Sequence, residues 1–152
     1  MPFDLPPTLA AFDLPSDYDL CFAGYGMEPR RPRAPTGLLH FAPVAATLAA
    51  KTRTWNTPGA YGYFLSRRGA ETLLDLVARD GFAGDVDWRL IAYSIGKTDY
   101  EGLPPESFAS TALGRHLACI GARPSITGYC LYPALFLPGR AGSTRMADNI
   151  VR

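Results

Sequence analysis

The sequence predicts a single α/β domain built on a small sheet with crossover helices. Two observations lead to this prediction. Short apolar runs bounded by turn residues, typical of strands, occur at 19–24 and 60–65, and an amphipathic helical pattern follows the second run. Strands that alternate with helices favour a sheet with some parallel pairs. With 152 residues, 47% of them hydrophobic, we expect one domain over 1–138 and a flexible polar tail over 139–152.

Charge and cysteine content exclude several classes of function. Fifteen basic and fourteen acidic residues give a net charge of +1, so no broad positive field attracts nucleic acid or an anionic membrane. The first twenty residues hold no Lys or Arg and lack the basic start of a signal peptide. No apolar run reaches the roughly 18 residues of a transmembrane segment. Cys21, Cys119 and Cys130 show no metal-binding spacing, so we expect buried thiols in a cytoplasmic protein.

Four strands are expected. The run DLCFAG at 19–24 has turn residues on both sides and predicts a buried central strand. A second strand or hairpin is expected over 38–44. The aromatic run AYGYFL at 60–65 predicts a third strand. The fourth is expected within 126–137, where Pro133 either places it at a sheet edge or interrupts it.

The clearest helical signal begins at Ser66, a good N-cap residue, and continues to about Asp80, with Gly81 as the stop. The residues expected on its buried face follow the helical repeat: Ala70, Leu73, Leu74 and Val77.

Two more helices are expected further along the chain. One covers DVDWRLIAYSIG and places Trp88, Ile91 and Ile95 on one side, and the other runs over about 110–120.

Two arginines occupy the first turn after Ser66, where the helix dipole favours acidic side chains. Arg67 and Arg68 could cradle a phosphate together with the exposed N–H groups of that turn. Equally, Glu71 is spaced to form an ion pair with either arginine. Both interpretations stay open on sequence alone.

Acidic residues at two places suggest sugar chemistry. Asp17 and Asp19 have the D-x-D spacing with which many sugar-nucleotide enzymes hold a divalent metal, but the pair enters a strand instead of leaving one, so a solvated turn is the favoured interpretation. Asp85 is a natural N-cap, and Asp87 would lie in the first turn of its helix. Because Asp87 is next to Trp88, it is also a candidate to bind a sugar, by hydrogen bonds beside an aromatic surface.

The two histidines, His40 and His116, have no carboxylate or cysteine at a spacing typical of a triad or a zinc site. We therefore expect both to be structural.

Several of these segments, taken in order, resemble a known family. GAYGYFLSRRGAETLL, GDVDW and CLYPALF, preceded by LPSDYDLCFAG, are similar to the second half of glycosyltransferase family 25. That family contains the bacterial lipooligosaccharide transferases and their collagen-modifying relatives. The resemblance covers residues 14–138 and implies a partial GT-A-like fold, with the strand at 60–65 in the sheet centre.

The resemblance also implies an activity, which is transfer of a hexose from a nucleotide sugar to a saccharide acceptor in lipopolysaccharide biosynthesis. Asp87 would be the catalytic base, and Asp85 and Trp88 would bind the acceptor. The residues carried over to the donor phosphates are Asn56, Thr57, Ser66, Arg67 and Arg68.

The family's nucleotide-binding part and its acidic metal motif have no counterpart in this chain. A Mn²⁺ or Mg²⁺ cofactor is therefore implied only if the donor site is complete, and its ligands stay unassigned. The alternative is an inactive remnant that acts as a saccharide- or protein-binding module. An incomplete sheet edge also favours a homo-oligomer.

Overall fold

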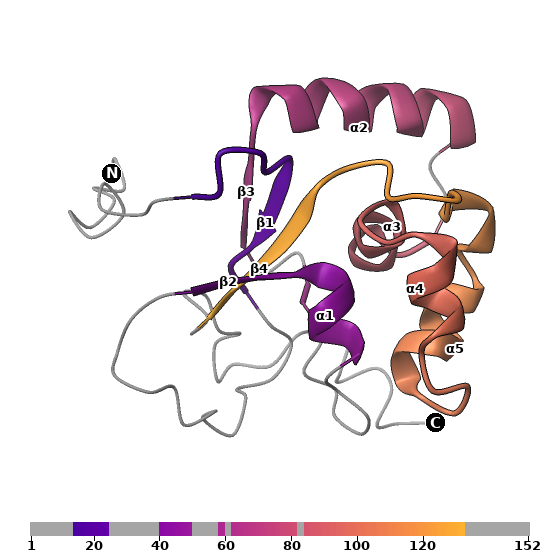
Figure 1. Cartoon of the computed structure of the whole chain (residues 1–152). Helices are drawn as coiled ribbons and strands as arrows, with labels where there is room; N and C mark the ends of the chain where they lie inside the picture. The colour runs from indigo at the N-terminus through magenta and orange to yellow at the C-terminus, as the bar shows by residue number, and fades with distance from the viewer. Residues whose placement is uncertain (1–13, 25–39, 50–57, 60–61, 82–83, 133–152) are drawn as a thin grey trace, which may run out of the picture.

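The described part of the chain forms one mixed sheet covered by helices. Figure 1 shows the fold in a computed structural model, which describes residues 14–24, 40–49, 58, 59, 62–81 and 84–132. The strands are β1 (Leu20–Phe22), β2 (His40–Pro43), β3 (Tyr63–Leu65) and β4 (Gly128–Tyr132). Their order in the sheet is β2-β4-β1-β3, with β1 and β4 parallel and the two outer pairs antiparallel. The predicted α/β class is confirmed, with a single parallel pair in this sheet.

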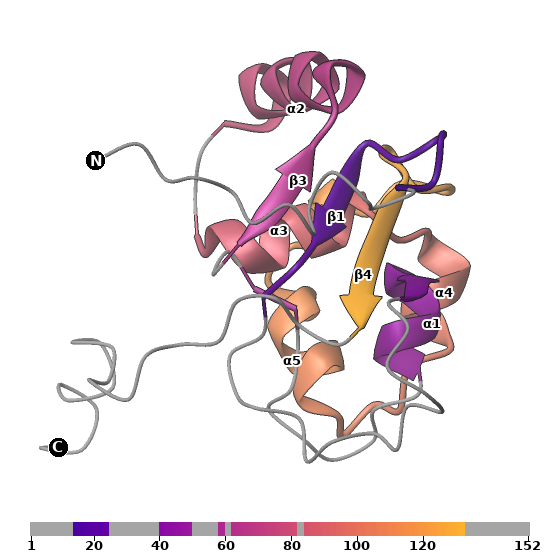
Figure 2. The same cartoon turned by 90° about the vertical axis from the view of Figure 1, so that its left-hand side faces the viewer.

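Most helices lie on one face of this sheet. The helices are α1 (Val44–Ala49), α2 (Arg67–Asp80), α3 (Val86–Tyr93), α4 (Lys97–Glu101) and α5 (Phe108–Gly114), followed by the 3₁₀ helix η2 (Leu117–Cys119). Figures 1 and 2 show α1, α3, α4 and α5 together on one side, while α2 crosses above one end of the strands.

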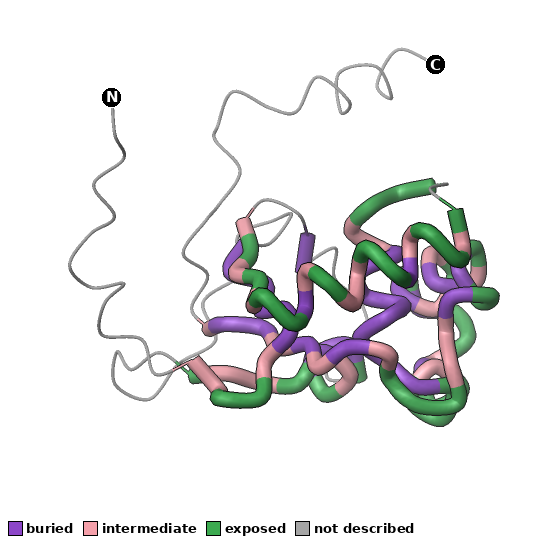
Figure 3. The backbone as a smooth tube through the Cα atoms, turned by 90° about the horizontal axis from the view of Figure 1, so that it is seen from above, coloured by how far each residue is buried: buried purple, intermediate pink, exposed green. Residues whose placement is uncertain are grey.

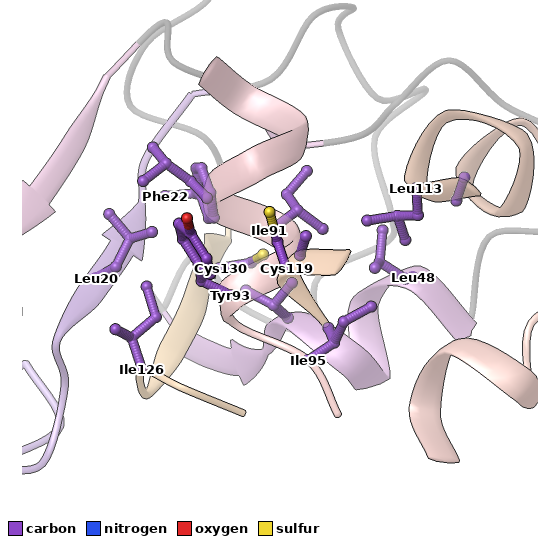
Figure 4. Close-up of a cluster of buried hydrophobic side chains, with 14 of the residues drawn as sticks. Leu20, Phe22, Leu48, Ile91, Tyr93, Ile95, Leu113, Cys119, Ile126 and Cys130 are labelled. Carbon is purple, nitrogen blue, oxygen red and sulfur yellow. The ribbon is translucent and has the colours of Figure 1, made fainter. Parts of the chain in front are cut away.

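The main core fills the space between the sheet and these helices. Leu20 and Phe22 of β1 and Cys130 of β4 pack with Ile91 and Tyr93 of α3 (Figure 4). All five are fully buried, and burying a side chain of this size stabilises a fold by about 1.5–3 kcal/mol. Figure 3 shows the same arrangement along the backbone, with buried stretches inside and exposed stretches on the outer helical turns.

A second, smaller cluster lies on the opposite face of the sheet. Its buried members are Cys21, Ala23 and Leu131, with partly buried aromatic residues packed around them. The prediction of buried free cysteines is confirmed for all three thiols. Burial raises the pKa of the Cys21 thiol to about 12, so this sulfur stays protonated and unreactive at neutral pH.

The predicted position of the third strand is wrong. β3 lies at the edge of the sheet, not at its centre, and it pairs there with β1 alone among the described strands. Tyr63 and Leu65 are 44% and 37% exposed. The central position was implied by the family resemblance alone, because aromatic residues favour strands at edges and centres alike.

One of the two alternatives for the fourth strand, an edge position, is wrong. β4 lies inside the sheet, between β2 and β1, although Pro133 suggested an edge. The strand as described runs to Tyr132, and Pro133 lies outside the described residues. The other alternative, interruption by Pro133, stays a prediction.

The helix bounds agree with prediction best where capping signals are local. α2 runs from Arg67 to Asp80 and ends at Gly81 with a positive φ of 69°, as expected. Its buried residues, however, are Gly69 and Leu76, and Leu74 is 71% exposed, so the expected buried face is displaced.

Three other helical features depart from prediction. α5 begins at Phe108 because the Ser107 hydroxyl caps the N–H of Ser110, and it ends at Gly114, well short of residue 120. α1 and α4 were not predicted. A signal for α4 was available, because Asp99 accepts a hydrogen bond of 2.9 Å from the N–H of Gly96, as in a capping box.

The start of α2 is held directly against β1. The Ser66 hydroxyl caps the helix by accepting from the N–H of Gly69 at 2.9 Å, and the Ser66 N–H donates to the Asp19 carbonyl at 3.0 Å. A Cβ atom on Gly69 would lie 2.2 Å from that same carbonyl oxygen. Glycine is therefore required here for close approach of the helix to the strand.

We predict that Gly69→Ala destabilises the protein by about 1–3 kcal/mol, because the backbone must shift to admit the methyl group. This loss would occur even though Ala is the better helix former by about 1 kcal/mol. Urea unfolding would measure it. Gly114→Ala is the matched control, because its nearest contact would be the Tyr100 hydroxyl at 3.7 Å. Equal stability of the two variants would contradict the prediction.

Candidate functional site

The carboxylate of Asp19 joins three elements at one end of the sheet. Its Oδ1 accepts from Nε of Arg68 at 2.7 Å, and its Oδ2 accepts from the N–H of Thr127 at 2.8 Å. The backbone N–H of Asp19 in turn donates to the Thr127 carbonyl at 2.9 Å. The side chain is only 9% exposed, so these donors replace the water that the charge loses on burial. Asp19 thus ties β1 to the start of β4 and to α2.

Arg67 and Arg68, at the start of α2, have different partners. Arg68 binds Asp19 through Nε, and its Nη2 donates to the Asp17 carbonyl at 2.6 Å. Arg67 forms an exposed ion pair with Glu71 at 2.9 Å, with 92% of its side chain in solvent. The ion-pair interpretation is therefore confirmed for Arg67, whereas Arg68 pairs with Asp19 instead of Glu71. Both guanidinium groups are matched by carboxylates of the same chain.

The D-x-D pair is not arranged as two neighbouring ligands of one ion. Asp19 is buried in the contacts just described, whereas the Asp17 carboxylate accepts from the Tyr129 hydroxyl at 3.1 and 3.3 Å. The solvated-turn interpretation fits Asp17, but it is wrong for Asp19. In the part of the chain that the structure describes, no three His, Cys, Asp or Glu side chains are grouped to hold a metal.

The acidic residues before Trp88 lie where the sequence predicted. Asp85 is the N-cap of α3, although its side chain makes no capping hydrogen bond, and Asp87 is in the first turn. Trp88 is partly buried and packs against the main core. Its ring meets that of Phe108 edge-to-face, with centroids 5.5 Å apart. We call Asp85, Asp87, Trp88 and Phe108 the Trp88 platform.

The other end of α2 is fixed to α3. The Tyr93 hydroxyl donates to Oδ2 of Asp80 at 2.9 Å, and Nη1 of Arg89 donates to the Gly81 carbonyl. Asp80 also accepts two hydrogen bonds from Arg79, and this pairing with Arg79 lowers the Asp80 pKa to about 2. The Asp80 carboxylate is therefore ionised throughout the neutral and mildly acidic range.

These contacts place the predicted donor and acceptor residues apart. Ser66, Arg67 and Arg68 are at the N-terminal end of α2, and α3 is anchored at its C-terminal end. A helix of 14 residues spans about 20 Å. Figure 1 shows the two regions at opposite ends of α2. The structure therefore brings together Asp85, Asp87 and Trp88, but not these residues with the arginine pair. The remaining donor candidates, Asn56 and Thr57, lie outside the described residues.

Sequence reasoning missed two participants in these regions. Asp19 was weighed only as half of a D-x-D motif, because its partners Arg68 and Thr127 are distant in sequence. Phe108 was not considered, since nothing in the sequence links it to Trp88.

Comparison with known proteins identifies no relative of this chain. No protein family, curated protein or solved structure matches the chain. Among the described residues, no helix combines the length and apolar character needed to cross a membrane.

We predict that Arg68→Ala lowers stability by about 1–3 kcal/mol, because it leaves the buried Asp19 carboxylate with one donor fewer. Arg67→Ala makes the same change one residue earlier on the same turn, so it is a matched control. Its loss should stay below about 0.5 kcal/mol, since the Glu71 pair is exposed. Urea unfolding of both variants measures the difference. Equal losses would show that the Asp19 contact contributes nothing beyond a surface pair.

Proposed function

We propose that this protein binds a saccharide at the Trp88 platform, on a glycosyltransferase-like scaffold that does not itself transfer the sugar. The observation that carries the proposal is the edge-to-face pair of Trp88 and Phe108 directly beside the carboxylates of the first turn of α3. The resemblance to glycosyltransferase family 25 points to the same residues, since it assigns Asp85 and Trp88 to the acceptor.

The chemistry of the platform suits a sugar. Phe108 is 43% exposed, and its ring meets that of Trp88 edge-to-face. The apolar C–H face of a pyranose can pack on such a ring. Carboxylates beside it accept hydrogen bonds from sugar hydroxyls, and bonds of this kind to a charged group are the stronger ones. The negative charge of Asp85 and Asp87 favours a neutral saccharide over an anionic one.

The contacts of the donor candidates support binding rather than transfer. A transferase must hold the nucleotide diphosphate and the acceptor hydroxyl within bonding distance of one sugar carbon. Here the Ser66 hydroxyl caps α2, Arg68 binds Asp19, and Arg67 binds Glu71. These groups belong to the first turn of α2 or its cap, whereas Asp87 lies on α3, which is bonded to the opposite end of α2. Asp87 is therefore proposed as a hydrogen-bonding group for the saccharide, and its role as a base is left to the alternative, hexose transfer.

We predict that lactose, cellobiose or chitobiose changes the fluorescence of Trp88. A Trp55→Phe background leaves Trp88 as the single tryptophan of the chain. In that background, Phe108→Ala and Asp87→Asn should each weaken binding by about tenfold, because they remove the exposed ring and a charged acceptor. Leu74→Ala is the control, since Leu74 is exposed on α2 away from the platform. Absence of binding to all three sugars, or unchanged affinity in Phe108→Ala, would refute the proposal.

The same protein should give no metal-dependent response to a nucleotide sugar. UDP-glucose or UDP-galactose with Mn²⁺ would stabilise a complete donor site by a few kcal/mol at about 100-fold excess over Kd. We expect no such thermal shift and no release of UDP in the presence of the disaccharides. Release of UDP would instead establish hexose transfer, and the binding-only proposal would then be wrong.

A further inference from the structure

A buried histidine supports the turn that leads into the Trp88 platform. His116 lies between α5 and η2 and is 5% exposed. Its ring packs against Gly84, where an added Cβ would be 2.8 Å from the ring atom Cε1. Gly84 directly precedes Asp85, the N-cap of α3. The imidazole therefore braces the backbone that carries Asp85.

The groups around this ring are mostly cationic. Arg89 of α3 and Arg115, at the end of α5, act on His116 with positive charge, and Asp85 acts with negative charge. Arg89 is itself buried, with its Nε lacking a hydrogen-bond partner. On the α2 side, Asp80 is the carboxylate that faces Arg89. A second positive charge on His116 would thus form beside a guanidinium that is already short of acceptors.

Burial and the nearby Arg89 charge lower the pKa of His116 below its ordinary value of 6.5, and Asp85 opposes them only in part. The folded state therefore prefers the neutral ring. Because the unfolded chain binds the proton more readily, the contribution of His116 to the free energy of unfolding is constant above about pH 6.5 and decreases as the pH falls below that value.

Two glycines near this contact have backbone angles that other residues rarely adopt. Gly81 and Gly84 both have positive φ, 69° and 84°, a region open to glycine at little cost. Such positions can absorb changes in backbone angle without steric strain. Displacement of the His116 ring would therefore act on the turn between α2 and α3 before it acts on the core.

We propose that His116 is an acid-sensitive latch for this turn: in its neutral form it holds Gly84 and Asp85 in place, and its protonation releases them. The loosened turn then misplaces Asp85 and Asp87 and weakens saccharide binding. That last step rests on the proposed function, whereas the latch itself does not.

The latch is tested without any sugar. The protonation of His116 and the free energy of unfolding are both measured from about pH 7.5 to about pH 4.5. The Cε1 proton of His116 should titrate below pH 6.5 in the NMR spectrum, and His40→Gln identifies which signal belongs to His116. Over the same range, the folding equilibrium constant should fall by up to about tenfold per pH unit. His116→Gln should lose this dependence, and His40→Gln should keep it, since His40 is exposed on β2.

Release of the turn is read from Trp88 fluorescence in the Trp55→Phe background, again without sugar. Its change should follow the His116 titration. A titration at or above pH 6.5, or equal pH dependence in His116→Gln and the parent protein, would overturn the latch. A Trp88 signal that ignores the His116 titration would overturn release of the turn. If His116→Gln fails to fold, the titration and fluorescence of the parent protein decide.

Failure of the latch and failure of the proposed function remain distinguishable. A protein that shows the pH dependence but binds no disaccharide retains the latch and loses the function. Asp80 does not interfere with the pH dependence assigned to His116. Its carboxylate has a pKa of about 2 in the folded state. The stabilisation that it contributes is lost only below about pH 4, between the unfolded and the folded pKa values.

Discussion

The architecture of this protein depends on one buried carboxylate. Asp19 sits at the start of β1, with the beginning of β4 on one side and the beginning of α2 on the other, and it is bonded to both. A buried charge is destabilising unless hydrogen-bond donors surround it. β1, β4 and α2 are therefore stable around Asp19 only when all three are folded. The same contact fixes the register of the central pair, since a slip by one residue would exchange the two faces of the strand.

That constraint also decides what the surface can do. With α2 anchored at Asp19, its first turn is occupied by intramolecular ion pairs, and its other end is delivered to α3. The saccharide site that we propose is therefore limited to the Trp88 platform, and the cationic turn contributes to the scaffold. Arg68 illustrates how a residue that looks like a phosphate ligand can serve to balance a carboxylate inside its own fold.

The features that could be predicted from sequence are those whose cause is local. Ser66 and Gly81 mark the ends of α2 because a cap and a positive φ are properties of neighbouring residues. The features missed depend on partners distant in the chain. The edge position of β3, the exposure of Leu74, the contact of Arg68 with Asp19 and the pairing of Trp88 with Phe108 all depend on tertiary packing. Periodicity specifies that a face is buried, but not what covers it.

The parallel pairing of β1 with β4 has a consequence for how the chain acquires its shape. The hydrogen bond from Thr127 to Asp19 closes a separation of 108 residues. Contacts between residues so distant in sequence form slowly, because the chain loses the entropy of closing a long loop before the contact stabilises the fold. Until β4 is synthesised, β1 can pair only with β3. Its other edge then lacks a partner strand and is exposed to aggregation in shorter nascent chains.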